Sequence, residues 1–433
     1  MRDSVTIATG TGIAQLILIL SSPIITRQYG PEAFGVLGIF TSLIAIVSPV
    51  ATLTYEDAII VPSSDKEAAQ LLVLSLLIGT CSALLFSGVV ISYHQIINAF
   101  GFKIASSYLF LIPVVVFCDV VSRSLERWLI RAREFNSIQM IEVSHAVATS
   151  GSKICLGLIA PTAPVLVALE TAGHVFRAAL FLIKTRNSLP DGNLLSLILH
   201  QKYIKALSLL ALVRKYRDFS IYRAPSILLA AITVGTPTVL LASFFGPSAA
   251  GFYALSMRIL QMPTVLIAES VGKAFLPRIA TAVQQNRNPR SFIVKTTAAL
   301  ACIGAIPFGS IILFGPWLFG MVFGLNWVKA GLYARWLSLP LYVWFISVPC
   351  LNAIPVLRLQ AQNLVFTAFI SGARILMLVL GALLFKNDIV SVALLSLSHA
   401  LIAIGRNIWV ISVSENCIIG RSQLTGEGPW EGQ

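Results

Sequence analysis

The sequence has little charge. Asp, Glu, Lys and Arg make up 11% of its 433 residues, whereas about 25% is usual for a soluble globular chain. Hydrophobic residues make up 57%, and apolar stretches close to the roughly 20 residues that cross a hydrocarbon core as a helix follow one another along the chain. They leave no room for a soluble domain, so we expect an all-α polytopic membrane protein.

The motifs of several enzyme classes are absent from the sequence. It contains no nucleotide-binding loop of the type G-x-x-x-x-G-K-[ST], no H-E-x-x-H metal pair and no large catalytic loop. ATP hydrolysis by this chain is therefore excluded, and we expect neither an enzyme nor a cofactor. The cysteines form no C-x-x-C pair and no metal-ligand spacing, so we expect no redox chemistry and no metal. All six lie in or beside apolar segments: Cys81, Cys118, Cys155, Cys302, Cys350 and Cys417.

A typical signal peptide is also missing. The charge of Arg2 is cancelled by Asp3, and the apolar run from Val5 to Ile25 is too long for the short hydrophobic region of such a peptide. We expect this run to be the first membrane span. The net charge of +13 does not point to nucleic acid, because the basic residues are separated by spans and form no continuous stripe with aromatics between them.

Twelve spans can be placed along the chain, six in each half. Because six is even, the second half keeps the orientation of the first, and we expect two pseudo-symmetric six-helix bundles about an axis along the membrane normal. The predicted spans are 5–26, 35–61, 68–93, 105–127, 138–160, 163–184, 220–244, 250–271, 292–315, 330–353, 362–385 and 388–413.

Charge asymmetry between the loops predicts that both termini are cytoplasmic, because Lys and Arg accumulate in cytoplasmic loops. The outer side then holds only Arg27, Lys103, Lys329, Arg335 and Lys386. The cytoplasmic side holds Arg123, Arg127, Arg131, Arg133, Lys184, Arg186, Lys202, Lys205, Arg214, Lys215, Arg217, Arg223, Lys273, Arg278, Arg287, Arg290, Lys295 and Arg358.

Residues 194–213 have the length of a span but carry His200, Lys202 and Lys205 at their centre. A thirteenth span would invert the second half and put its basic loop outside. We therefore expect a basic amphipathic helix on the cytoplasmic surface. The predicted organisation is an N-terminal bundle (1–184), a basic cytoplasmic linker (185–219), a C-terminal bundle (220–413) and a cytoplasmic tail (414–433).

A short motif reveals the duplication. Residues 29–38 (YGPEAFGVLG) return as residues 245–254 (FGPSAAGFYA), 216 positions later. Gly30 suits the end of one helix, while Pro31 and Glu32 suit the first turn of the next, which predicts a tight turn with a structural role on the outer face. Two weaker echoes are Arg131 and Asn136 with Arg358 and Asn363, offset by 227, and Glu170 and Arg177 with His399 and Arg406, offset by 229.

Cations inside the spans are the first candidates for a site, because ionisable groups at membrane depth are costly and usually face a polar interior. They are Lys153, Arg177, Arg258, Arg374 and Arg406, four of them on corresponding spans of the two halves. A membrane fold of two similar halves usually binds its substrate between them, which indicates transport. A cavity lined by these cations would suit an anion, because guanidinium groups match phosphate oxygens. For each cation the alternative is an ion pair between packed helices or a head group at the interface.

Acidic residues within or at the ends of spans are candidates for ion coupling. They are Glu56, Asp57, Asp119, Glu142 and Glu170. Glu170, His174 and Arg177 follow i, i+4, i+7 spacing and share one stripe of the sixth span. Such a stripe could carry coupling protons, but we favour a satisfied interhelical network. The i, i+4 series from Asp119 through Arg123 and Arg127 to Arg131 is more typical of an interfacial anchor than of a site.

Four segments carry a family resemblance. Residues 24–39 (ITRQYGPEAFGVLGIF), 55–62 (YEDAIIVP), 244–259 (FFGPSAAGFYALSMRI) and 275–280 (FLPRIA) resemble O-antigen and polysaccharide flippases of the multidrug/oligosaccharidyl-lipid/polysaccharide exporter superfamily. The similar span layout covers nearly the whole chain.

The resemblance implies a V-shaped pair of six-helix bundles in a bacterial inner membrane. By alternating access it would move an undecaprenyl-pyrophosphate-linked oligosaccharide to the periplasmic leaflet, for lipopolysaccharide O-antigen or another surface polysaccharide. Lys153, Arg258 and Arg374 would then hold the pyrophosphate or acidic sugars. Membrane lipids, a polysaccharide polymerase and chain-length proteins would be its partners.

Two alternatives remain open. A multidrug or cation antiporter of the same superfamily would be expected to show carboxylates rather than cations in its cavity. A membrane enzyme that transfers or polymerises sugars would generally need a large extramembrane loop, and the longest connection here is basic and cytoplasmic.

Overall fold

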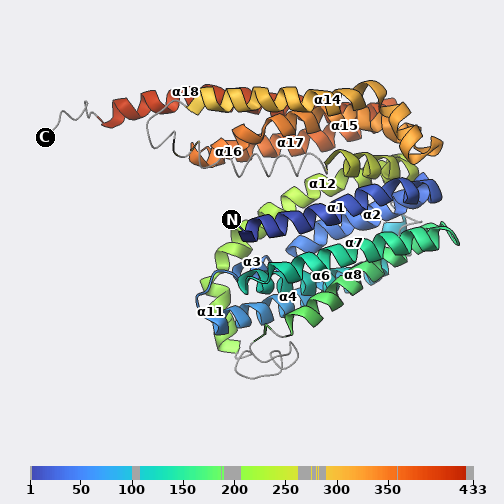
Figure 1. Ribbon diagram of the computed structural model, residues 1–433, viewed down its shortest axis with the longest axis vertical. Coiled ribbons are helices and arrows are strands. Elements are labelled where there is room, and N and C mark those ends of the chain that lie inside the picture. Colours follow the sequence, from blue (N-terminus) through green and yellow to red (C-terminus); the bar gives the residue numbers. More distant parts are fainter. Residues whose placement is uncertain are drawn as a thin grey trace. The chain divides into compact units, whose positions relative to one another are not determined.

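A computed structural model describes residues 2–99, 108–186, 188–189, 206–261, 275, 279, 281, 289–357 and 359–425 (Figure 1). The side chains of 2–11, 93–99, 206–208 and 415–425 lie outside this description. All regular secondary structure in the described residues is helical. The chain divides into two compact units, Met1–Ala254 and Leu255–Gln433.

The first unit begins with the long helix α1 and continues through α12. Its elements are α1 (Arg2–Gln28), α2 (Pro31–Val47), η1 (Ser48–Val50), α3 (Tyr55–Ala58), α4 (Asp65–Ala99), η2 (Leu109–Leu111), α6 (Ile112–Arg131), α7 (Phe135–Gly157), α8 (Ala163–Thr185), α11 (Ala206–Lys215), the π-helical turn η3 (Phe219–Arg223) and α12 (Ala224–Phe245). Residues 247–261 are helical as well.

In its described residues, the second unit has four long helices and shorter connecting ones. Its elements are α14 (Pro289–Phe323), η4 (Leu325–Trp327), α15 (Val328–Ile346), α16 (Val348–Val356), α17 (Gln360–Leu380), the π-helical turn η5 (Gly381–Phe385) and α18 (Asp388–Thr425). Proline opens several helices of both units, for example Pro31 in α2 and Pro349 in α16. A proline in the first turn loses no helical hydrogen bond, because its missing N–H would have had no partner there.

Seven helices in the described residues are long and apolar enough to cross a membrane, and a bent pair, Leu325–Ile346 with Val348–Val356, makes an eighth. The helices α1, α6 and α7 have 27, 20 and 23 residues, also enough to span, and α6 and α7 carry much of the buried charge described below. Parts of the predicted spans 105–127 and 250–271, and most of the predicted surface helix 194–213, lie outside the described residues. Of the last, α11 is helical as expected.

The same order of helix packing recurs in both units. In the first, α4 packs on α6, α6 on α8, and α7 on α8. In the second, α14 packs on α15, α15 on α18, and α17 on α18. If the second half repeats the first, α4, α6, α7 and α8 correspond to α14, α15, α17 and α18. Corresponding helices therefore pack in the same way in the two units. The division of the sequence at residues 184, 219 and 413 stays a prediction.

The repeated turn motif forms the tight connections that the sequence predicts. Gly30 lies between α1 and α2 in an extended conformation. Its counterpart Gly246 ends α12 with φ +85°, a region that glycine reaches without strain. The two motifs also touch each other. A Cβ on Gly35 would collide with the carbonyl oxygen of Pro247, and a Cβ on Gly251 would collide with that of Pro31. Each glycine thus lets the backbone of the other repeat approach, a role beyond the turn expected from the sequence.

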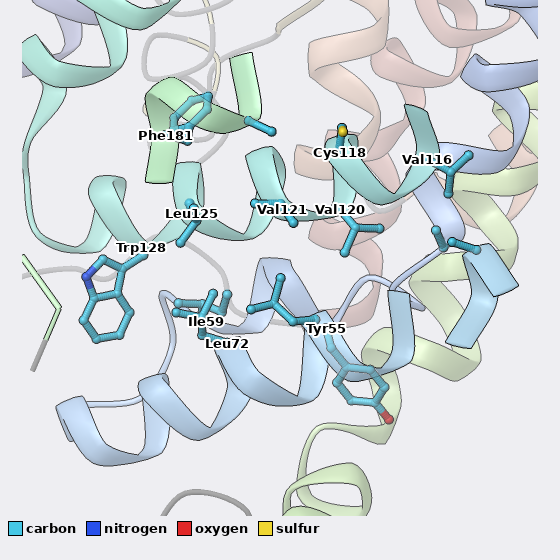
Figure 2. Packing of buried hydrophobic residues seen from close by; sticks show 14 of the residues in the cluster. Tyr55, Ile59, Leu72, Val116, Cys118, Val120, Val121, Leu125, Trp128 and Phe181 are labelled. Atoms are coloured by element: carbon cyan, nitrogen blue, oxygen red, sulfur yellow. The ribbon is translucent and has the colours of Figure 1, made fainter. Parts of the chain in front are cut away.

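A large core fills the first unit between α2, α3, α4, α6, α7 and α8. Figure 2 shows part of it, where Leu72 of α4 and Leu125 and Trp128 of α6 lie with Ile59, just after α3. Lipid is as apolar as this core, so close packing rather than hydrophobicity alone holds such helices together. The polar side chains described in the next subsection lie on α6, α7 and α8, which this close packing holds in place.

Candidate functional site

An ionisable network joins α6, α7 and α8 of the first unit. At its centre Nδ1 of His174, on α8, lies 2.7 Å from Oδ1 of Asp119, on α6. The other oxygen of Asp119 accepts a hydrogen bond of 2.7 Å from Ser48, which lies in the η1 turn after α2. Asp119 is buried. The pair therefore ties three elements together at one carboxylate.

Lys153 of α7 extends the network. Its Nζ lies 2.5 Å from Oε2 of Glu170, one turn before His174 on α8. The other oxygen of Glu170 lies 4.0 Å from Nε2 of His174. The backbone carbonyl of Lys153 accepts a hydrogen bond from the hydroxyl of Tyr29, which fixes this turn of α7 to the end of α1. The ion pair, which was the alternative to an anion ligand, is what the structure shows for Lys153.

Arg177 extends the same network toward the C-terminal end of α8. Its Nη2 lies 2.6 Å from Oε1 of Glu142, on α7, and 3.3 Å from Oε2 of Glu126, on α6. The guanidinium also lies 5.3 Å from the ring centre of Phe181, one turn further along α8. The interhelical network favoured for the stripe of Glu170, His174 and Arg177 is thus present.

The series that begins with Asp119 on α6 forms a row of ion pairs, and its role as an interfacial anchor stays a prediction. Each of its arginines forms an ion pair with an acidic residue of another element: Arg123 with Glu56, Arg127 with Asp57, and Arg131 with Asp65. Asp57 also pairs with Arg223 at 2.7 Å, in the turn before α12. The i, i+4 spacing places the arginines in a row on one face of α6. The carboxylates of the α3–α4 segment lie next to this face and pair with them.

Outside the membrane-spanning segments, Lys215 at the end of α11 donates a hydrogen bond to Glu67 in the first turn of α4. This bond raises the pKa of the Lys215 ammonium. Several basic residues predicted to be cytoplasmic are therefore neutralised locally in the first unit.

The second unit contains a different arrangement of cations. Arg374 of α17 and Arg406 of α18 are both buried, with 8% and 7% of their surface exposed. The charges of both act on the ring of His399, also on α18. Within the described part of the chain neither arginine has a carboxylate partner, and Nε of each has no hydrogen-bond acceptor. Buried guanidinium groups without an anion are costly, so this pair has unmet capacity for one.

The repeat explains this difference between the units. At the offset of 229, His399 occupies the position of Glu170 and Arg406 that of Arg177. At the offset of 227 that aligns Arg131 with Arg358, the acidic partner Glu142 corresponds to Phe369. The second unit keeps the arginine, and it has a histidine and a phenylalanine where the first unit has Glu170 and Glu142. Among the residues of this unit whose side chains are described, Asp388 is the one carboxylate; it lies at the start of α18 and pairs with Lys329 of α15.

The remaining predicted site residue, Arg258, lies in the helical segment 247–261 and is partly exposed. Sequence reasoning missed Glu126 and Ser48. Glu126 lies seven residues after Asp119 and so on the same face of α6, a spacing that could have identified it. No local pattern identifies Ser48, because only the fold brings the η1 turn to α6.

A family model described as polysaccharide biosynthesis protein matches residues 24–331. The chain belongs to this family. The match spans most of the first unit and part of the second, and it agrees with the resemblance seen in residues 24–39 and 244–259. No curated protein sequence matches the chain.

Solved structures of transporters share the fold of this polysaccharide biosynthesis protein. An inward-facing multidrug resistance MATE family transporter of the MOP superfamily matches with a TM-score of 0.74 and 13% identity, over 93% of this chain and 96% of its own. The lipid II flippase MurJ, in an inward closed conformation, matches with a TM-score of 0.71 and 12% identity, over 98% and 94%.

A third match is a MOP superfamily transporter from Pyrococcus furiosus, described as having a binding pocket of reverse polarity that suggests a different function. Its TM-score is 0.52 at 13% identity, with 96% of each chain covered. At these identities the likeness shows the fold alone. The all-helical, multi-pass membrane fold predicted from the sequence is confirmed.

Proposed function

We propose that this protein is a flippase that moves a polyprenyl-pyrophosphate-linked oligosaccharide from the cytoplasmic to the periplasmic leaflet of a bacterial inner membrane. The proposal includes its use for O-antigen or another surface polysaccharide. The family match to polysaccharide biosynthesis supports the pathway, and the fold shared with transporters and a lipid II flippase supports the mode of action.

The observation that carries the proposal is the pair of buried arginines in the second unit. A pyrophosphate offers several anionic oxygens, and the planar guanidinium group can bind two oxygens at once through two hydrogen bonds. Arg374 and Arg406 are buried, lack a carboxylate among the described residues and act on one histidine. Lys153 and Arg177, proposed for the same role, are held by glutamates in the first unit, so the headgroup is assigned first to the second unit.

A charge exchange tests the assignment. His399→Glu places a carboxylate beside both arginines, at the position that Glu170 has in the first unit. We expect the flipping of a fluorescent polyprenyl-pyrophosphate oligosaccharide in proteoliposomes to fall at least about tenfold, since the internal anion occupies the guanidinium groups. His399→Gln, which adds no charge, is the matched control and retains flipping. Equal rates in the two variants would contradict the assignment.

The cellular counterpart is a deletion strain. It should fail to assemble surface polysaccharide and should accumulate lipid-linked units on the cytoplasmic side. Normal polysaccharide export in that strain would exclude the proposed substrate.

A cation or drug antiporter is the second candidate, and the acidic network of the first unit favours it. That network holds four carboxylates, Asp119, Glu126, Glu142 and Glu170, against the fixed charges of Lys153 and Arg177. Efflux of an ethidium-type cation that survives Lys153→Ala and Arg374→Ala would support this candidate over the flippase.

A further inference from the structure

The ring of His174 lies between two carboxylates. Its Nδ1 is 2.7 Å from Asp119 and its Nε2 is 4.0 Å from Glu170. A neutral imidazole has one N–H, so one ring nitrogen would turn a lone pair toward an anionic oxygen. The imidazolium has two N–H groups and offers one to each side. The geometry therefore favours a protonated ring.

The counter-charge of Asp119 leads to the same conclusion. In the described residues Asp119 has His174 as its one cationic partner within ion-pair distance, and its other oxygen has the Ser48 hydroxyl. Lys153 is held by Glu170 and Arg177 by Glu142 and Glu126. If His174 loses its proton, Asp119 stays a buried anion that accepts hydrogen bonds from the ring and from the Ser48 hydroxyl but has lost its cationic partner, which is costly. The two residues therefore gain or lose one proton as a unit.

The groups that face this pair come from all the elements packed around it. α6 contributes Cys118 and Glu126 beside Asp119, with Arg123 and Arg127 toward its end. α7 contributes Glu142, His145 and Lys153, and α8 contributes Glu170 and Arg177. α2 also packs on α8, and the charged residue it carries is Glu32 in its first turn. Carboxylates outnumber fixed cations around the histidine, so the surroundings accommodate an added proton.

We propose that Asp119 and His174 form a proton-binding pair that couples a proton gradient to the transport cycle. The inference rests on the proposed transport function and adds its energy source. The pair joins α6, α8 and η1, so a change of its charge acts directly on the packing of three elements. A bound proton can then shift the conformational equilibrium by as much as its affinity differs between the two conformations.

The proton-binding pair is tested first without any substrate. In purified full-length protein carrying ¹³C-labelled histidine, the NMR signal of His174 is followed against pH and assigned by its loss in His174→Gln. We expect Asp119→Asn to move the titration midpoint of His174 by at least about one pH unit. His145→Gln changes a histidine of α7 that forms no ion pair with Asp119 in the described residues; it is the matched control and leaves the midpoint in place. An unchanged midpoint in Asp119→Asn would overturn the pair.

Coupling is tested in proteoliposomes with the fluorescent polyprenyl-pyrophosphate oligosaccharide. We expect an imposed pH gradient to raise the initial flipping rate at least about fivefold in the wild type and in His145→Gln. In His174→Gln and Asp119→Asn the rate should be the same with and without the gradient. A sodium gradient should leave the wild-type flipping rate unchanged. If sodium accelerated flipping, the coupling ion would be sodium rather than the proton, and the proposal would be overturned.

The two proposals fail in distinguishable ways. Wild-type flipping that ignores the pH gradient overturns proton coupling and leaves the flippase intact. Absence of flipping in wild-type liposomes, together with a His174 midpoint that responds to Asp119→Asn, overturns the proposed function and keeps the proton-binding pair.

Discussion

At the scale of single residues, the cations inside the helices have different partners in the two units. Lys153 is buried and Arg177 is partly buried, with carboxylates at 2.5 and 2.6 Å. Arg374 and Arg406 are buried beside a histidine. Sequence spacing identified all four side chains and left open whether each is paired. The difference follows the repeat, in which Glu142 and Glu170 of the first unit correspond to Phe369 and His399 of the second.

The Lys153–Glu170 pair predicts a specific pattern of stability. Lys153→Met removes the cation and leaves Glu170 as an anion near the centre of the network. We expect a loss of about 3 kcal/mol, the usual scale for breaking a buried pair, seen as a lower unfolding midpoint in detergent. Lys153→Met/Glu170→Gln should recover most of the loss, because no charge is then left unpaired. A single variant as stable as the wild type would show that the pair is not needed for folding.

At the scale of elements, helix ends and turns were the most predictable features. The G-P pairs marked the starts of α2 and of the helical segment 247–261, where proline and a preceding glycine allow a tight reversal. The row of arginines on α6 was predictable as a stripe but its partners were not. The partners come from α3 and the start of α4. The position of this short segment depends on the left-handed backbone conformation of Leu53 and Thr54. No pattern in the sequence predicts that turn.

The contact of the two turn motifs yields a prediction for the helix pair α2 and 247–261. Gly35→Ala adds a methyl group that meets the Pro247 carbonyl, so the helices must separate. We expect a loss of about 1–3 kcal/mol, as for other overpacked sites, again read from the unfolding midpoint.

Gly30→Ala is the matched control for that experiment. Gly30 has φ −73°, which alanine adopts readily, and a Cβ there meets nothing within 4 Å. The free energy of unfolding of Gly30→Ala should lie within about 0.5 kcal/mol of that of the wild type. Equal destabilisation by both substitutions would mean that the loss comes from the turn rather than from the helix contact.

At the scale of the whole molecule, composition alone determined the class. With 57% hydrophobic and 11% charged residues, and with apolar stretches of span length along the sequence, the chain had to be a helical membrane protein. The fold shared with superfamily transporters bears this out. Residues that meet across distant elements, such as Ser48 with Asp119, could not be predicted, because their distances depend on packing and not on periodicity.

The orientation in the membrane is a prediction that labelling can check. In a variant without its native cysteines, a single cysteine at Ser63 should react with an impermeant thiol reagent from the cytoplasmic side, and one at Asn326 from the outer side. Both positions are exposed, so access depends on the membrane and not on burial. Reaction of both from one side would contradict the odd number of predicted spans between them and the orientation derived from the loops.

The mutual approach of Gly35 to Pro247 and of Gly251 to Pro31 has the form of an isologous interface, in which one surface patch serves both partners. A chain of half this length, carrying a single copy of the turn, would present the same patch to a second copy of itself. We therefore expect the ancestor of this protein to have been a homodimer whose subunits met at this turn. Fusion of two such genes would convert a symmetric dimer contact into an intramolecular one and would leave the two halves free to differ, as Glu170 and His399 do.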